Sequence, residues 1–322
     1  MRRTTIDIGT NTILMLIAEF DKKAFSINPV LDIQRIPRLG KGVDSSRNIL
    51  PESIQKAITI LNEYKQISLE NGSVKITATA TSFIRDSHNK NEFINAIKEN
   101  TSIEIEVLSG EDEARWTFIG GIYDKLRVTN DGLWIITIDI GGGSTEITSA
   151  PLFPPGGGKN ISLLDLSVKG KSLNVGSVRI KEKILTSHPP LQNEIKQAEE
   201  FILSYLNQFD KFDEFDKSDK LIGLAGTITT LGAIKLGLDK FIADKVDNLE
   251  LSITDIRQLL SILSTKSLYE LYSIGNYMGG RADIIIPGTL ILKCFMEKFG
   301  FDKLTISTKG LRYGIFLRDL LN

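Results

Sequence analysis

Short runs of apolar and β-branched residues alternate along this chain with longer amphipathic segments. The run Leu133–Thr137 predicts a buried strand, and Val74–Ala80 predicts a second one. Pro51–Leu69 instead places apolar residues at helical spacing behind a proline, which suits the first turn of a helix. The pattern therefore predicts a globular chain of mixed strands and helices.

The strand after Leu133 ends at Asp139 in a glycine-rich turn. Consecutive glycines weaken a strand, so such a run indicates close backbone approach to a ligand. Successive backbone amides in a tight turn form a concave donor nest that suits a phosphate. The residues of this turn are Gly141, Gly142, Gly143, Ser144, Thr145 and Glu146.

Two carboxylates, Asp139 and Glu146, flank this predicted nest. Carboxylates repel a phosphate unless a cation or a water molecule lies between them. The arrangement therefore indicates metal-assisted phosphate chemistry, in which these two residues would hold Mg²⁺ or the attacking water. The alternative interpretation is a plain hairpin turn at a sheet edge.

The same motif occurs near the start of the chain. Asp7-Ile8-Gly9-Thr10 aligns with Asp139-Ile140-Gly141-Gly142, and Asn11 follows the first copy. An internal repeat of this kind predicts two similar domains, each with one phosphate loop. We expect the two loops to face each other across a cleft.

Bulk properties narrow the function classes. A chain of 322 residues exceeds the usual size of one core, so two domains are expected. The formal net charge of −1 gives no general attraction to nucleic acid or to an acidic membrane. No apolar run is long enough for a membrane span and the start lacks the core of a signal peptide, so a cytoplasmic protein is expected. Two histidines and one cysteine exclude a zinc site and a Ser-His-Asp triad.

Two further segments are candidates for the site. Thr81 and Ser82 suit the start of a helix, whose free amides favour anions, and Arg85 would bind a phosphate there or pair with Asp86 or another acid. The basic segment Arg35–Val43 is either a polyanion contact or a solvated connector.

An acidic helix start follows at Glu111, Asp112 and Glu113. Capping of the helix dipole would explain it. Crowded carboxylates also raise the pKa of one member, as a general base near neutral pH requires.

These motifs together resemble the exopolyphosphatase / guanosine pentaphosphate phosphohydrolase family, in its short two-domain form. The resemblance rests on the two loops, on Ala80-Thr81-Ser82-x-x-Arg85-x-x-x-Asn89 and on the acid before Ala114-Arg115, and it covers nearly the whole chain. The family belongs to the sugar kinase, heat-shock ATPase and actin superfold. The resemblance implies an α/β fold of two actin-like, ribonuclease H-like domains with mixed sheets and an interdomain cleft. Domain I would span 1–125, completed by 309–322, and domain II would span 126–308.

The resemblance also implies roles for individual residues. Glu113 would be the catalytic base, with Glu146 and Arg85 as further catalytic residues and Asp139 and Glu146 as metal ligands. Arg281 and Lys309 are additional candidate contacts. The phosphate-binding residues would be Asp7, Gly9, Thr10, Asn11, Gly141, Gly142, Gly143, Ser144, Thr145, Gly226 and Thr227.

The expected activity is hydrolysis of a terminal phosphoanhydride in polyphosphate, guanosine pentaphosphate or both. A kinase or ATPase of the same superfold is one alternative, and a catalytically weak sensor of guanosine tetra- or pentaphosphate is another. The family often forms homodimers. The segment Pro151–Lys171 departs from the family pattern through a proline- and glycine-rich insertion.

Overall fold

The computed structural model describes residues 1–125, 134–151, 166–209 and 220–321. The chain divides into two compact units. Unit 1 comprises Met1–Gly120 and Gly310–Asn322, and unit 2 comprises Gly121–Lys309. The insertion predicted at 151–158 falls almost wholly outside the described residues.

Unit 1 contains a mixed five-stranded sheet in the order β3-β2-β1-β4-β5. β1, β4 and β5 run parallel, whereas β2 and β3 are antiparallel to their neighbours. The strands are β1 (Arg2–Ile8), β2 (Ile13–Asp21), β3 (Ser26–Arg35), β4 (Ser73–Ala80) and β5 (Ile105–Val107).

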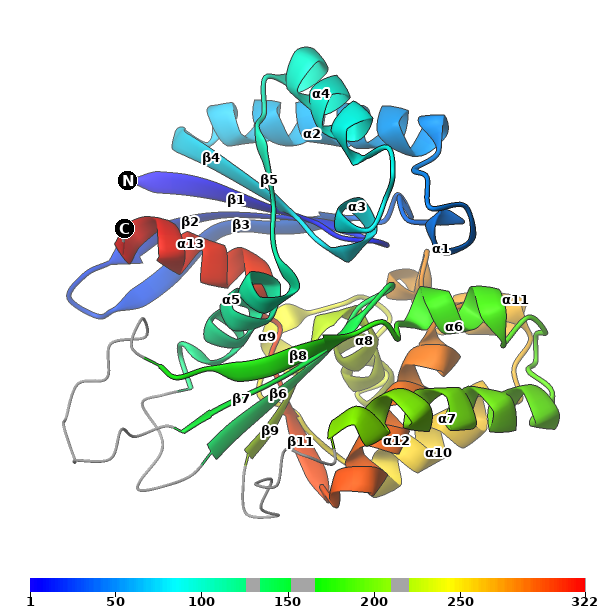
Figure 1. Ribbon diagram of the computed structural model, residues 1–322. Coiled ribbons are helices and arrows are strands. Elements are labelled where there is room, and N and C mark those ends of the chain that lie inside the picture. Colours follow the sequence, from blue (N-terminus) through cyan, green and yellow to red (C-terminus); the bar gives the residue numbers. More distant parts are fainter. Residues whose placement is uncertain (126–133, 152–165, 210–219, 322) are drawn as a thin grey trace. The chain divides into compact units, whose positions relative to one another are not determined.

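Helices cover both faces of this sheet, with α2 and α4 on one side and α13 on the other (Figure 1). The predicted helix from Pro51 is confirmed as α2. The predicted helix after Thr81 is present as the single turn α3. A separate helix, α4, begins at Lys90. The helices are α1 (Val43–Ser46), α2 (Pro51–Glu70), α3 (Ser82–Arg85), α4 (Lys90–Thr101), α5 (Gly110–Ile122) and α13 (Leu311–Leu321).

Successive side chains of β1 point to opposite faces of the sheet. Ile6 and Ile8 are buried in one core with Leu61 of α2. Thr5 and Asp7 point to the opposite face, because side chains alternate along a strand. The Thr5 hydroxyl donates a hydrogen bond to the carbonyl of Arg312 on α13 at 2.8 Å. The first predicted phosphate loop thus follows a strand fixed on both faces.

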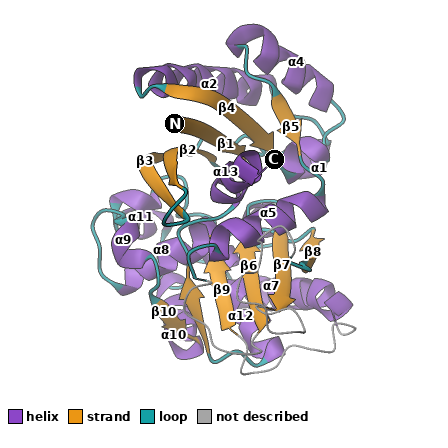
Figure 2. Ribbon diagram, turned by 90° about the vertical axis from the view of Figure 1, so that its left-hand side faces the viewer, coloured by secondary structure: helices purple, strands orange, loops and turns teal. Residues whose placement is uncertain are grey.

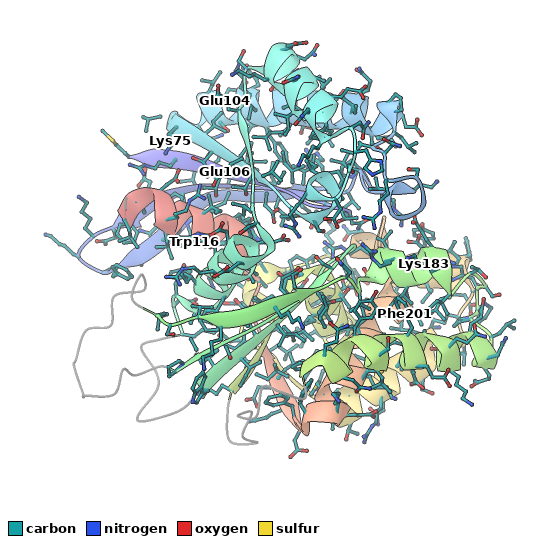
Figure 3. The ribbon with its side chains drawn as sticks, viewed as in Figure 1. Lys75, Glu104, Glu106, Trp116, Lys183 and Phe201 are labelled. Carbon is teal, nitrogen blue, oxygen red and sulfur yellow. The ribbon has the colours of Figure 1, made fainter. Side chains whose placement is uncertain are left out.

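Ion pairs attach α13 to the sheet of unit 1. The Arg318 guanidinium donates to both carboxylate oxygens of Glu106 on β5, at 2.9 and 2.6 Å. The Lys75 ammonium on β4 lies 2.9 Å from a carboxylate oxygen of Asp319. Figure 3 shows Lys75 and Glu106 on their strands. The last helix is therefore an integral part of the unit that the first strand begins.

Unit 2 contains a mixed six-stranded sheet in the order β10-β11-β9-β6-β7-β8. β6, β9 and β11 are parallel, and β7, β8 and β10 are antiparallel to their neighbours. The strands are β6 (Trp134–Ile140), β7 (Thr145–Pro151), β8 (Lys169–Leu173), β9 (Lys220–Leu224), β10 (Glu250–Ser252) and β11 (Lys303–Ile306).

The core of unit 2 is built around α12, which contacts β6 and the helices α6, α7, α8 and α10 (Figure 2). Ile136, Ile138 and Ile140 of β6 enter this core, so Asp139 points to the opposite face. The helices are α6 (Ser177–Lys183), α7 (Gln192–Leu206), α8 (Ala225–Lys235), α9 (Ala243–Val246), α10 (Ile253–Leu263), α11 (Leu268–Tyr272) and α12 (Ile285–Phe299), with 3₁₀ turns η3 (Asn207–Phe209) and η4 (Asn276–Met278).

Among the described helices, none is long and apolar enough to cross a membrane.

Helices α5 and α13 of unit 1 pack backbone against backbone. A β-carbon at position 314 would lie 1.8 Å from the carbonyl oxygen of Trp116, which Figure 3 labels on α5. A β-carbon at position 310 would meet nothing within 4 Å. Only one of these two neighbouring glycines is therefore sterically required.

Gly314→Ala is expected to lower the free energy of unfolding by about 3 kcal/mol, because a rigid carbonyl cannot move aside for the added methyl group. Gly310→Ala is the matched control and is expected to change it by less than about 0.5 kcal/mol. Urea denaturation of both variants and the unsubstituted protein measures the difference. Equal stabilities for the two variants would contradict the observed packing.

Candidate active site

The predicted site residues of unit 1 follow three neighbouring parallel strands. Ile8 pairs with Ala80, and Ala80 pairs with Val107, so β1, β4 and β5 end side by side. Ligands of open α/β sheets bind beyond the carboxyl ends of their parallel strands. The structure therefore brings together the turn after Asp7, the turn containing Arg85 and the start of α5 with Glu113.

Unit 2 repeats this arrangement with β6, β9 and β11. Asp139 pairs with Leu224, and Gly223 pairs with Ile306. The glycine loop after Asp139, the start of α8 with Gly226 and Thr227, and the segment leading to Lys309 consequently emerge from one edge of the sheet.

The two glycine loops close by the same hydrogen bond. The amide of Gly9 donates to the carbonyl of Thr12 at 2.9 Å, and that of Gly141 donates to the carbonyl of Ser144 at 3.0 Å. A β-carbon on Gly9 would lie 3.2 Å from that acceptor, and one on Gly141 would lie 3.1 Å from its own. The repeat in the sequence is therefore also a repeat in backbone geometry.

The loop of unit 2 is held by the first turn of α6. Each of its three glycine carbonyls accepts a hydrogen bond from that turn. The bonds run from Ser177 N–H to Gly141 O (3.0 Å), Val178 N–H to Gly142 O (2.9 Å) and Arg179 Nε–H to Gly143 O (3.0 Å).

These bonds also fix the direction of the loop amides. A trans peptide is planar, so its N–H points opposite to its C=O. With the carbonyls turned toward α6, the amides of Gly142, Gly143 and Ser144 point away from it. The N–H groups of Gly142 and Gly143 form no hydrogen bond with any residue that the structure describes. Such a set of convergent donors suits an anionic oxygen.

Close approach of α6 requires Gly176. A β-carbon at this position would lie 2.3 Å from the carbonyl oxygen of Gly142. Sequence analysis did not select Gly176 or Ser177. The available signal was a glycine directly before a helix start, which indicates a close backbone contact without identifying the partner.

In unit 1 the basic segment takes the place of α6. The amide of Gly40 donates to the carbonyl of Thr10 at 2.8 Å, and that of Arg38 donates to the carbonyl of Asn11 at 3.1 Å. Arg38 adopts a left-handed backbone conformation with φ of 56°. The segment predicted as a polyanion contact or a solvated connector is thus a backbone support for the first loop.

Two carboxylates lie next to the loop of unit 2. Asp139 and Glu146 are directly opposed residues of the antiparallel pair β6 and β7, so their side chains share one face of the sheet. Glu146 is only 4% exposed. Like charges in opposed positions repel, and a divalent cation or a water molecule relieves that repulsion.

Asp139 and Glu146 are too few to enclose a metal ion by themselves, but two carboxylates suit Mg²⁺ when phosphate and water complete its coordination. No group of three or more acidic, histidine or cysteine side chains in the described ranges is arranged to hold a metal. Mg²⁺ typically binds one or two carboxylates together with substrate phosphates and water.

In unit 1, Arg85 and Glu113 form an ion pair. The Arg85 Nη1 group donates to Glu113 Oε2 at 2.9 Å and to the carbonyl of Leu108 at 3.0 Å, while Asp86 lies 4.0 Å from Nε. Glu113 is 7% exposed. The alternative left open for Arg85, pairing with an acid, is realised here with Glu113.

Of the other two acids of this helix start, Asp112 takes part in capping and Glu111 is exposed. Ser109 and Asp112 exchange hydrogen bonds, with the hydroxyl donating to the carboxylate at 2.7 Å and the Asp112 amide donating back at 3.0 Å. Glu111 is exposed. Of the three acids, only Glu113 is buried beside a guanidinium.

Gly226 and Thr227 occupy the first turn of α8. A β-carbon on Gly226 would overlap the Arg281 guanidinium, at 1.4 Å from Nη1, so that group lies against the backbone of this first helical turn. Desolvation by burial lowers the pKa of Arg281 to about 10, and the group therefore stays cationic at neutral pH. Ala225 has a φ of 66°, an uncommon left-handed conformation for a residue with a side chain.

The Lys309 ammonium is engaged by protein carboxylates instead of being directed at a ligand. It lies 2.7 Å from oxygens of both Asp124 and Asp247. Burial alone would lower the pKa of Lys309, but the hydrogen bonds to these two acids raise it. Its prediction as a phosphate contact is not supported by this arrangement.

Both units thus define a class of protein, an actin-like α/β fold in which each sheet carries a glycine turn closed by the same amide-to-carbonyl hydrogen bond. Residues 16–322 match the Ppx/GppA phosphatase family. The chain belongs to this family, which confirms the resemblance and the predicted fold class of two actin-like α/β units with mixed sheets.

Three relatives illustrate the match. The chain is 33% identical to a bifunctional 3-dehydroquinate synthase/phosphatase of Fusobacterium nucleatum, over 99% of this chain and 47% of that protein. It is 27% identical to exopolyphosphatase 2 of Mycobacterium tuberculosis, over 98% of each chain. The crystal structure of an exopolyphosphatase from Cytophaga hutchinsonii superposes with a TM-score of 0.85 at 25% identity, over 99% of this chain and 98% of that one. The chain therefore spans about half of the bifunctional relative and nearly all of the other two.

Gly176→Ala is expected to weaken binding of tripolyphosphate by at least about tenfold, because the added methyl group displaces the carbonyl of Gly142 and turns its peptide. Gly279→Ala is the matched control in unit 2, since a β-carbon there would make only an ordinary contact at 3.4 Å. Isothermal titration calorimetry measures both. Unchanged affinity in Gly176→Ala would show that this loop does not bind the anion.

Proposed function

We propose that this chain hydrolyses the terminal phosphoanhydride of inorganic polyphosphate, of guanosine pentaphosphate, or of both. The observation that carries the proposal is the loop Gly141–Ser144, whose carbonyls are bound by α6 and whose amides point away beside two carboxylates. The exopolyphosphatase relatives support it at the level of the family.

Phosphoryl transfer requires little covalent chemistry from a protein and depends on positioning and charge stabilisation. In the proposed reaction the loop amides of Gly142 and Gly143 donate to oxygens of the transferring phosphoryl group. Glu113 orients and deprotonates the attacking water as general base. No covalent nucleophile takes part.

Arg85 serves this reaction in two ways. Its Nη1 group fixes the Glu113 carboxylate, and burial of Glu113 restricts alternative positions of the base. Its Nη2 group forms no hydrogen bond within the part of the chain that the structure describes. A guanidinium has donors enough to hold a carboxylate on one side and a phosphoryl oxygen on the other.

Asp139 and Glu146 are the proposed ligands of Mg²⁺. When bound, this ion would neutralise charge on the phosphate oxygens. The ion would lie between the two carboxylates and the substrate phosphate. Its positive charge would offset the repulsion between these negative groups.

Glu113→Gln is expected to reduce turnover by at least about 10²-fold with little change in substrate affinity, because a carboxamide keeps the shape but cannot accept a proton. Glu111→Gln is the matched control on the same helical turn, where the side chain is exposed. Phosphate release from polyphosphate measures turnover. Full activity of Glu113→Gln would remove this residue from the mechanism.

Chelation of divalent cations with EDTA is expected to abolish phosphate release, and added Mg²⁺ is expected to restore it. Asp139→Asn should raise the Mg²⁺ concentration required for half-maximal activity by about tenfold or more, because a neutral amide is a weaker ligand for a hard cation. Activity in EDTA that equals activity in Mg²⁺ would contradict a metal-assisted reaction.

The choice of substrate is tested by supplying polyphosphate, guanosine pentaphosphate and ATP separately and following phosphate release. Release from the first or second supports the proposal. Transfer from ATP to an acceptor would instead identify a kinase, and tight binding of guanosine pentaphosphate without release would identify a sensor.

A further inference from the structure

A row of polar side chains crosses the sheet of unit 2 beside the glycine loop. Asp139 on β6 pairs with Glu146 on β7, and Glu146 pairs with Ser172 on β8. Directly opposed residues of antiparallel strands project from the same face. The three side chains therefore form one line, with Glu146 in the middle.

Ser172 makes a specific contact with Glu146. Its hydroxyl donates a hydrogen bond to Glu146 Oε1 at 2.7 Å. Hydrogen bonds to an ionised acceptor are short and stronger than those between neutral groups. The contact holds a carboxylate that is only 4% exposed and faces a second carboxylate across the strand pair.

We propose that Ser172 is a positioning residue for Glu146. It fixes Oε1 and the plane of the carboxylate, so that Glu146 presents one defined orientation to the divalent cation. The inference rests on the proposed function, since it assigns Glu146 the role of a cation ligand. Removing a residue that hydrogen-bonds to a metal ligand typically lowers metal affinity or activity by 10- to 100-fold.

The position of Ser172 in the chain strengthens the inference. β8 leads within a few residues to Gly176 and the first turn of α6, which binds the three glycine carbonyls. One short segment, Ser172–Arg179, therefore orients both the oxyanion-binding amides and a carboxylate of the cation site. A shift of this segment would disturb both features together.

The test is a titration of the purified protein with Mn²⁺ alone, followed by electron paramagnetic resonance of the free ion. Ser172→Ala is expected to weaken Mn²⁺ binding by about tenfold. Ser172→Thr keeps the hydroxyl on a side chain that suits a strand and is expected to restore binding to within about threefold. Ser149→Ala is the matched control, because this buried serine of β7 is an odd number of residues from Glu146 and lies on the opposite face.

A double-mutant comparison separates positioning from a general structural effect. In a Glu146→Gln background, Ser172→Ala should cause no further loss of Mn²⁺ affinity, because the group through which the hydroxyl acts is already gone. Additive losses would overturn the proposal. So would equal Mn²⁺ affinity in Ser172→Ala and the unsubstituted protein, or an unsubstituted protein whose Mn²⁺ binding does not depend on Glu146.

Failure of the proposed function is distinguishable from failure of this inference. A protein that releases no phosphate from any tested substrate would refute the proposed function. The Mn²⁺ titration would still report whether Ser172 and Glu146 act as one unit in binding a divalent cation.

Discussion

Three hydrogen bonds between the carbonyls of Gly141–Gly143 and the first turn of α6 set the direction of the amide groups in the loop of unit 2. A glycine run has no side chains to fix its peptide planes, so in isolation it would sample many orientations. Bonding the carbonyls on one side decides the direction of every amide on the other. The arrangement needs Gly176, since a side chain there would separate helix and loop. The direction of the amides in this loop thus depends on a segment that follows it by more than thirty residues.

The glycine loop of unit 1 is held in a similar way by a different supporting element. Its loop closes through the same amide-to-carbonyl bond, but a turn segment with Arg38 and Gly40 supplies the donors that α6 supplies in unit 2. Both loops follow an aspartate on the face of the sheet opposite the main core. The repeated geometry shows that the shared constraint is the orientation of the peptide groups, whereas the supporting element differs between the units.

Much of the fold was predictable because it depends on local patterns. The loops after Asp7 and Asp139, the helix from Pro51 and the acidic start of α5 are all visible as short motifs, and the internal repeat indicated two similar units. The support from Gly176 and Ser177, the pairing of Ser172 with Glu146 and the capture of Lys309 by Asp124 and Asp247 were not predictable, because they join residues distant in sequence. A single sequence shows a glycine or a charge but not the group it meets. The helix start predicted at Thr81 and Ser82 is present as the single turn α3, and its shortness was not visible in the sequence.

The discontinuity of unit 1 has a consequence for how the protein is made. Unit 2 is formed by one uninterrupted stretch, Gly121–Lys309, whereas unit 1 joins two stretches that this stretch separates in the sequence. The sheet of unit 1 is complete only when Thr5 meets Arg312 and Glu106 meets Arg318, and these partners on α13 lie 307 and 212 residues further along the chain. During synthesis, the first strands of unit 1 therefore lack the α13 cover on one face until the whole of unit 2 has been translated.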